Sequence, residues 1–223
     1  MNNIKRLYIL SLLIFTCLAC HQKAIMDKTP IINEAPPPTP MPPVEEVKPP
    51  PPPPPPQETT PQKIIRVLQK MYQWQATQGG AMDFPLIDNG ERYTGLNQTV
   101  FAQRLKQLQA TKLFATGFLS AYNQIAQEIH RRLSTGEAEY WIGDMPPYGN
   151  DVDPWTNSQD APAQFWYQFR IQNFQFQGTQ AQFTWHWPVG YGDQPYWVGM
   201  VKEQGQWRIN YLQGFDLKTF FPK

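Results

Sequence analysis

Four aspartates, whose carboxylates could bind a metal ion, are clustered in the second half of the chain: Asp144, Asp151, Asp153 and Asp160. The pair Asp151-x-Asp153 has a spacing that suits Ca²⁺, because hard cations take carboxylate oxygens as ligands. The segment lacks the glycine and the distal glutamate of a calcium-binding loop. Aspartates also stabilise turns and cap helices. We therefore predict no metal site and no cofactor.

The chain has three histidines, which are the usual general acids and bases of enzymes. His186 stands between Trp185 and Trp187, so strand alternation places it in solvent if the tryptophans face the interior. His130 lies at the edge of a helical apolar stripe, and His21 lies in a proline-rich segment. We predict that none of them is catalytic or binds a metal.

Cys17 and Cys20 have the C-x-x-C spacing of redox and metal sites. Both lie in an apolar leader, however, in which Lys5 and Arg6 precede a run of 13 apolar residues, Leu7–Ala19. This pattern is typical of a secretory signal peptide, here residues 1–19. A membrane span needs about 20 apolar residues, so a permanent transmembrane anchor is the weaker interpretation.

The end of the leader, Cys17-Leu18-Ala19-Cys20, resembles the lipobox of bacterial lipoproteins. The resemblance implies cleavage before Cys20, which would then carry a diacylglycerol and an amide-linked acyl chain. Several acyl chains anchor a protein stably where one binds only marginally. We expect a lipid anchor in the bacterial cell envelope, in the outer or inner membrane and facing the periplasm.

Residues 20–61 read as a linker, because 16 of the 24 prolines lie between Pro30 and Pro61. Proline favours polyproline II, so the unbroken run Pro49–Pro56 predicts a stiff rod of roughly 25 Å. We interpret the segment as a spacer that holds the domain away from the bilayer. A docking site for a proline-binding groove is the alternative.

The remaining residues, 62–223, have the size of one domain. Three helices are predicted: one from Thr60-Pro61 to about Gln78, one from near Thr99 with Val100 and Phe101 on its apolar face, and one over about 112–133. The third has an apolar stripe made of Phe114, Phe118, Ile125, Ile129 and Leu133. Residues 82–94 are predicted as a loop with a turn at Asp88-Asn89-Gly90.

After Gly136 the apolar residues alternate with a period of two, which predicts strands. The alternation runs through 165–171 and 183–187, slips at Gln172-Asn173 as a β-bulge would make it slip, and resumes at 196–202 and 207–212. Hairpin turns are expected at 177–180 and 204–206. The sequence therefore predicts an α+β domain with N-terminal helices packed on a strongly curved antiparallel sheet.

This order of elements is similar to the cone-shaped nuclear transport factor 2-like fold. Within that fold, the residues resemble the bacterial family called domain of unknown function 3828. The resemblance rests on Met71-Tyr72-Gln73-Trp74, on the loop Asp153–Asp160 and on the closing segment Lys202–Ile209. It implies a cone and membership among envelope lipoproteins, and it implies no activity. Gln159 and Asp160 are its most distinctive residues, and we take them as loop candidates, expecting Asp160 to brace the loop against the sheet.

Aromatic residues are unusually dense in the strand half. Trp and Tyr combine a large apolar ring with a polar group, so exposed ones suit recognition. The candidates for a partner-binding surface are Tyr191, Tyr196 and Trp197 in the loop 191–197, with Trp155 as a further one. The alternative is that the aromatic side chains simply fill the cone and its hairpins. The aromatic residues concerned are Trp141, Tyr148, Trp155, Trp166, Trp185, Trp187, Tyr191, Tyr196 and Trp197.

Charge is nearly balanced, at +1 overall, and without Lys5 and Arg6 the 19 basic residues fall to 17 against 18 acidic ones. No basic stripe is present, so we predict no nucleic-acid partner. The leading hypothesis is a non-enzymatic binding module for an envelope protein, a peptide or a glycan. A periplasmic cone-fold hydrolase or isomerase, a toxin-neutralising immunity lipoprotein and a spacer to the cell wall are the alternatives.

Overall fold

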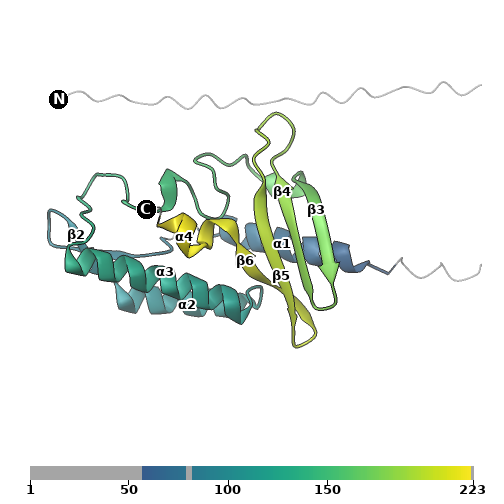
Figure 1. The fold of residues 1–223 in the computed structure, drawn as a ribbon, viewed down its shortest axis with the longest axis horizontal. Coiled ribbons are helices and arrows are strands. Elements are labelled where there is room, and N and C mark those ends of the chain that lie inside the picture. The colour runs from purple at the N-terminus through teal and green to yellow at the C-terminus, as the bar shows by residue number, and fades with distance from the viewer. Residues whose placement is uncertain (1–56, 79–81, 222–223) are drawn as a thin grey trace, which may run out of the picture. The chain divides into compact units, whose positions relative to one another are not determined.

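The computed structural model describes residues 57–78 and 82–221 (Figure 1). Cys20, the signal peptide and nearly all of the proline-rich linker lie outside these residues. Within them, no helix combines the length and the apolar character that crossing a membrane requires. The domain contains helices and antiparallel strands, which confirms the predicted α+β class.

The first helix, α1, spans Thr60–Ala76 and begins one residue earlier than the sequence predicts, with Thr59 as its N-cap. The side chain of Gln62 accepts a hydrogen bond from the Thr59 backbone N–H at 2.8 Å, which satisfies a group that the helix leaves without a partner. Four residues at helical spacing form the buried face that joins the core: Ile64, Leu68, Met71 and Tyr72.

Helix α2 spans Gln98–Thr111 and α3 spans Thr116–Thr135. Lys112 is left-handed (φ 59°) and ends α2, so α3 begins four residues later than predicted. Phe114 therefore precedes the helix, and it forms a parallel bridge with Ile209. The rest of the predicted stripe on α3 is buried, as expected. The prediction for Val100 is wrong, because that side chain is exposed.

The predicted loop 82–94 is partly wrong, since β1 (Leu86–Asp88) and β2 (Tyr93–Leu96) form an antiparallel hairpin there. The expected turn is confirmed: the Gly90 N–H donates to Asp88 Oδ1 at 3.0 Å. Both strands are too short for alternation to reveal them.

The main sheet is an antiparallel meander in the order β3-β4-β5-β6. Its strands span Arg170–Gln177, Gln180–His186, Tyr196–Glu203 and Gln206–Leu212, so both predicted hairpins are confirmed. The predicted bulge is confirmed too, because the β3-β4 register shifts between Gln172 and Gln175. Residues 165–167 were wrongly predicted as strand: they form the short 3₁₀ helix η2, Phe165–Tyr167.

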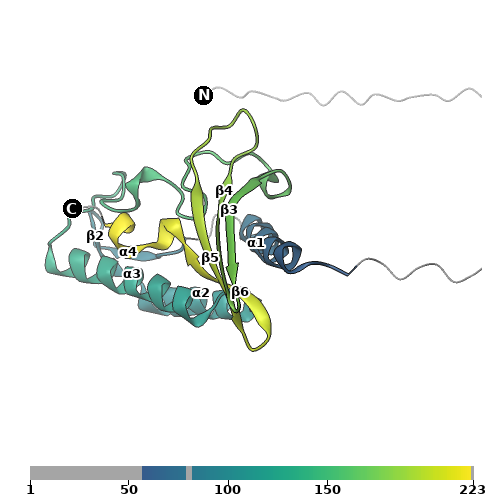
Figure 2. The same cartoon turned by 45° about the vertical axis from the view of Figure 1, so that its right-hand side comes forward.

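The two faces of the main sheet have different surroundings. One face, called the inner face here, carries the buried side chains Ala181, Phe183, Trp185, Val198 and Met200. Tyr72 of α1 meets Trp185 on this face with a ring-centroid distance of 5.7 Å. The views in Figures 1 and 2 both place α1 on that side of the sheet. The opposite face is called the outer face below.

The chain ends in two short elements, η3 (Gln213–Phe215) and α4 (Leu217–Phe220), and a third, η1 (Gly149–Asp151), lies in the long connection before the sheet. Phe215, Phe220 and Phe221 are buried in the same core as α1 and α3. These elements close the core on the side of α3.

Candidate functional site

Strand register brings together a row of residues across the outer face. Gln175 pairs with Gln182, Gln182 with Gly199, and Gly199 with Tyr211, one residue from each strand. Side chains in such a row point the same way because successive residues of a strand alternate between faces. The Gln182 Nε2 donates to Gln175 Oε1 at 2.6 Å, so the two amides are held side by side.

Two exposed aromatic side chains lie on this face. Trp197 is 44 % exposed and Tyr211 is 37 % exposed. Gly199 separates them, since it is two residues from Trp197 on β5 and directly opposite Tyr211 on β6. A Cβ atom at residue 199 would lie 3.0 Å from Tyr211 Cβ, so a side chain there would crowd the tyrosine. Glycine therefore keeps the floor between the two aromatic rings low.

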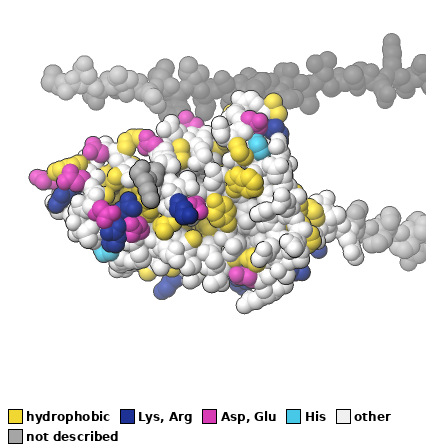
Figure 3. All heavy atoms as spheres, viewed as in Figure 1, with side chains coloured by type: hydrophobic (Ala, Val, Ile, Leu, Met, Phe, Trp, Pro, Cys, Tyr) yellow, Lys and Arg dark blue, Asp and Glu magenta, His cyan; other side chains and the backbone are white. Residues whose placement is uncertain are grey.

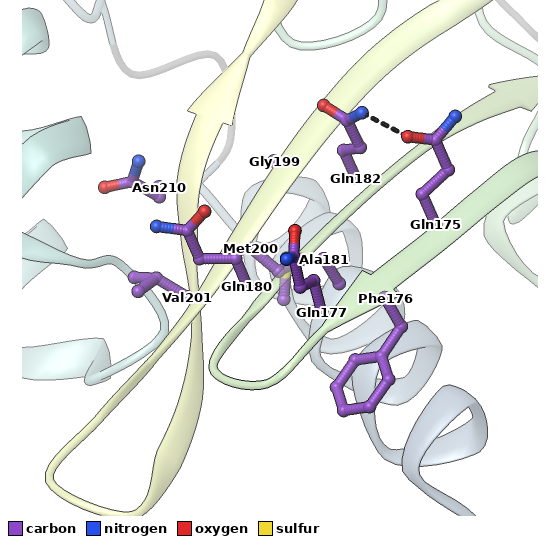
Figure 4. Close-up of a pocket in the computed structure, with 10 residues that line it drawn as sticks. All are labelled: Gln175, Phe176, Gln177, Gln180, Ala181, Gln182, Gly199, Met200, Val201 and Asn210. Atoms are coloured by element: carbon purple, nitrogen blue, oxygen red, sulfur yellow. Dashed lines mark hydrogen bonds between the residues drawn. The ribbon is translucent and has the colours of Figure 1, made fainter.

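The outer face contains two shallow hollows. The larger, of about 550 Å³, is lined by four glutamines, by Asn210 and by parts of the strands (Figure 4). The smaller, of about 260 Å³, lies between Trp197 and Tyr211. Both include Gln182 and Gly199, so they form one continuous depression, called the amide groove here. In Figure 4 the amides rise above the strands on one side, whereas Phe176 points away toward the helix.

The amide groove is electrically neutral: in the described part of the chain, none of the residues that line it is charged. Figure 3 shows charged side chains mainly over the helices and at the ends of the strands. An amide group offers two donors and an acceptor with two lone pairs. The groove can therefore make many directional hydrogen bonds to an uncharged polar ligand, beside two rings that can cover apolar surface.

The loop between β4 and β5 rises beside this face and holds Tyr191, which is 62 % exposed. Asp193 secures the loop to the sheet: its Oδ1 accepts a hydrogen bond from Arg170 Nη2 at 2.7 Å and lies 3.1 Å from His186 Nδ1. The hydrogen bond from Arg170, followed by that from His186, lowers the pKa of the Asp193 carboxyl. The sequence-based expectation that His186 faces solvent is wrong, because this loop covers it.

A chain of contacts runs from Thr184 through His186 to Asp193. This is the order in which the nucleophile, the base and the acidic residue contact one another in a catalytic triad. The Thr184 Oγ1 lies 3.4 Å from His186 Nε2, and the other ring nitrogen faces Asp193. Thr184 is completely buried, however. Its hydroxyl is within 3.2 Å of Asn173 Nδ2 and 3.3 Å of the Gln172 carbonyl. A hydroxyl enclosed in this way is not accessible to a substrate, so the group secures the loop.

A second polar cluster, centred on Asp83, was not predicted from the sequence. Arg104 is buried on α2, and its Nη2 forms an ion pair with Asp83 Oδ1 at 2.9 Å. The Tyr122 hydroxyl donates to the same oxygen at 2.9 Å, and Trp155 Nε1 donates to Oδ2 at 2.6 Å. Burial, followed by the charge of Asp83, raises the pKa of Tyr122. Every hydrogen-bonding side chain here has a partner, so the cluster connects elements of the core.

The structure divides the predicted partner-binding residues between the surface and the core. Tyr191 and Trp197 are exposed, whereas Trp155 and Tyr196 are buried. The Tyr196 hydroxyl donates to the Pro154 carbonyl at 2.7 Å, and the Trp155 ring bonds to Asp83. Burial removes both side chains from the surface that a partner can reach. Tyr211 and the glutamines of the amide groove take their place, and the sequence-based prediction missed them.

The predicted loop candidates lie elsewhere on the surface. Gln159 and Asp160 are exposed, and the Asp160 carbonyl accepts a hydrogen bond from Ser158 Oγ at 2.8 Å. They are not brought to the amide groove. Among residues 57–78 and 82–221, no three histidine, cysteine or acidic side chains come together as metal ligands would. Cys20 lies outside the described residues.

No family model, no curated protein and no solved structure matches this chain. Its function must therefore be argued from the chemistry of its own surface.

Proposed function

We propose that this protein is a lipid-anchored component of the bacterial envelope whose domain binds a partner without catalysing a reaction. The observation that carries the proposal is the outer face of the sheet, where Trp197 and Tyr211 stand exposed beside an uncharged groove. Large aromatic side chains are enriched among the residues that dominate binding energy. Tyr191, on the adjoining loop, extends the same surface.

The two polar clusters support a binding role over a hydrolase or isomerase. An enzyme of that kind needs an acid or base that reaches a pocket in which the substrate sits. The pairs His186–Asp193 and Arg104–Asp83 are each satisfied by neighbouring groups, and none of these four residues lines the amide groove. The groove instead presents amide groups and aromatic rings. These groups can bind a ligand, but they do not act as general acids or bases at neutral pH.

The membrane anchor is proposed from the leader, in which Lys5 and Arg6 precede an apolar run that ends at Cys20. We expect Cys20→Ser to move the protein from the membrane fraction to the soluble fraction, and Cys17→Ser to leave it in the membrane. Mass spectrometry of the mature N-terminal peptide would identify the acyl chains on Cys20. An unmodified N-terminal peptide in the membrane fraction would contradict the anchor.

We further propose the cone architecture of the nuclear transport factor 2-like fold and kinship with the domain of unknown function 3828. Three helices followed by an antiparallel meander, with α1 across the inner face, support this architecture. The proline-rich segment 20–61 is proposed as the spacer that separates the binding domain from the bilayer.

Affinity purification from envelope extract tests the binding role. The full-length protein, the double variant Trp197→Ala/Tyr211→Ala and the control Tyr167→Ala would be compared. Tyr167 is also an exposed aromatic residue, but it lies on η2, outside the groove. We expect the parent and the control to retain the same envelope component and the double variant to lose it. Equal recovery by all three proteins would overturn the proposed surface.

A further inference from the structure

The chemistry of the amide groove identifies the class of its ligand. We infer that the groove binds a neutral oligosaccharide chain, an inference that rests on the binding role proposed above. The relevant observation is the juxtaposition, on one open sheet face, of uncharged amide side chains and two exposed aromatic rings around Gly199. Each of these features matches one chemical property of a sugar ring.

The aromatic rings match the apolar side of a sugar. A pyranose has one or both faces covered by C–H groups, which pack against the face of an aromatic ring and remove apolar surface from water. Trp197 and Tyr211 flank a hollow of about 260 Å³ with Gly199 at its floor. A side chain at residue 199 would fill this space and crowd Tyr211. The low floor leaves room for a sugar ring.

The amides match the polar rim of a sugar. Hydroxyl and acetamido groups around a pyranose both donate and accept hydrogen bonds, and a glutamine or asparagine side chain does the same. Gln182 lies at the junction of the two hollows, with Gln175 bonded to it. Gln177 and Gln180 continue the amide lining toward the β3-β4 hairpin, and Asn210 lines the larger hollow beside Tyr211. One sugar unit can therefore pack against the aromatic rings while the next units along the chain contact the amides.

The lack of charge among the lining residues argues against charged ligands, and Arg208, which lies opposite Val201, is paired with Glu203. An anionic polysaccharide or a lipid headgroup would require Lys or Arg in the groove, and a basic peptide would require Asp or Glu. The lining residues of the described chain include none of these. The depression is also open and extends along the sheet, which suits a chain of linked units better than a single small molecule.

Isothermal titration calorimetry of the full-length protein, purified in detergent, tests this inference. Three neutral hexasaccharides serve as probes: chitohexaose, cellohexaose and maltohexaose. We expect at least one to bind and its affinity to fall at least about tenfold in Trp197→Ala and in Tyr211→Ala, since a truncated anchor costs more than about 1.4 kcal/mol. Gln182→Ala should weaken binding by a smaller factor, and Tyr167→Ala should leave it unchanged. Thermal unfolding of each variant confirms that the fold is retained.

Two results would overturn the oligosaccharide assignment. The first is that none of the three sugars binds at millimolar concentration. The second is that Trp197→Ala and Tyr211→Ala bind as the parent does. Decaproline is titrated in parallel, and binding of this peptide in place of the sugars, at the same residues, would assign a proline-rich partner instead. In that case, or if envelope purification still depends on Trp197, the proposed binding role survives although the ligand class does not.

Discussion

Tyr211 lies directly opposite Gly199 in the β5-β6 ladder, and a Cβ atom at residue 199 would come within 3.0 Å of Tyr211 Cβ. Glycine weakens a strand interior because it has no side chain to pack and loses more backbone entropy on folding. Gly199 in the middle of β5 therefore lowers the stability of the strand, and it keeps the floor of the groove open.

A side chain at residue 199 should abolish partner binding while leaving the stability of the fold nearly unchanged. We predict that Gly199→Val abolishes retention of the envelope partner, because the added methyl groups occupy the space beside Tyr211. The free energy of unfolding should change by less than about 1 kcal/mol, since the better strand propensity of valine offsets the close contact. Purification of the partner and urea unfolding are the measurements. A valine variant that still holds the partner would show that the groove is not used.

The ion pair between Arg104 and Asp83 should contribute strongly to the stability of the fold. Asp83→Ala leaves a buried guanidinium without its partner, which costs about 3–5 kcal/mol when a buried pair is broken. Denaturant unfolding measures the loss. The matched control is Glu58→Ala, which removes the partner of Arg66, a side chain that is 60 % exposed, and should cost less than about 1 kcal/mol. Similar losses in both variants would contradict the structural role of the Asp83 cluster.

Trp155 should support the core and contribute nothing to partner binding. Trp155→Phe keeps an aromatic ring but removes the Nε1 donor that lies 2.6 Å from Asp83 Oδ2. A buried oxygen that loses its partner costs about 1–3 kcal/mol, so the unfolding midpoint should fall while the partner is still retained. Loss of the partner at unchanged stability would restore Trp155 as a binding residue.

The sequence identified the helices and most of the sheet because burial follows periodicity. The stripe on α3 and the alternation of Phe183 and Trp185 both mark side chains of the core. The short hairpin β1-β2 and the 3₁₀ helix η2 were missed, since three or four residues carry too little pattern. Arg104 was unpredictable for another reason: its partner Asp83 is 21 residues away and meets it only in the folded chain.

The candidate site was predicted only in part, and strand geometry explains why. Tyr196 and Trp197 were treated together, although adjacent strand residues point to opposite faces, and only Trp197 reaches the surface. Tyr211 comes two residues after the buried Ile209, so strict strand alternation would point its side chain into the core. The β5-β6 register shifts between Gly199 and Met200, which leaves Asn210 as an extra residue on β6. That bulge turns Tyr211 to the outer face.

The ion pairs at the end of α3 predict a modest dependence of stability on pH. Hydrogen bonds from Arg131 and then Arg132 lower the pKa of Glu128 from 4.5 to about 2. A depressed pKa in the folded state stabilises the protein above the unfolded value, and this contribution is lost as the pH falls from about 4.5 to about 2. Glu128→Gln should therefore cost less than about 1 kcal/mol at pH 7.

The difference between Glu128→Gln and the parent should shrink toward zero near pH 2, and it should also shrink in about 1 M salt, which screens surface charges. Thermal unfolding at several pH values measures both effects. A difference that persists unchanged at low pH and in high salt would mean that Glu128 acts through packing and not through its charge.

Oxidative footprinting of the protein in intact cells shows directly whether a partner covers the outer face of the sheet. Modification of Trp197 and Tyr211 would be measured relative to Tyr167 in the same sample, in cells and in the purified protein. We predict that the ratio falls several-fold in cells, because a bound partner shields the groove and leaves η2 exposed. An equal ratio in both samples would contradict the account, since the outer face would then be as open in the envelope as it is in isolation.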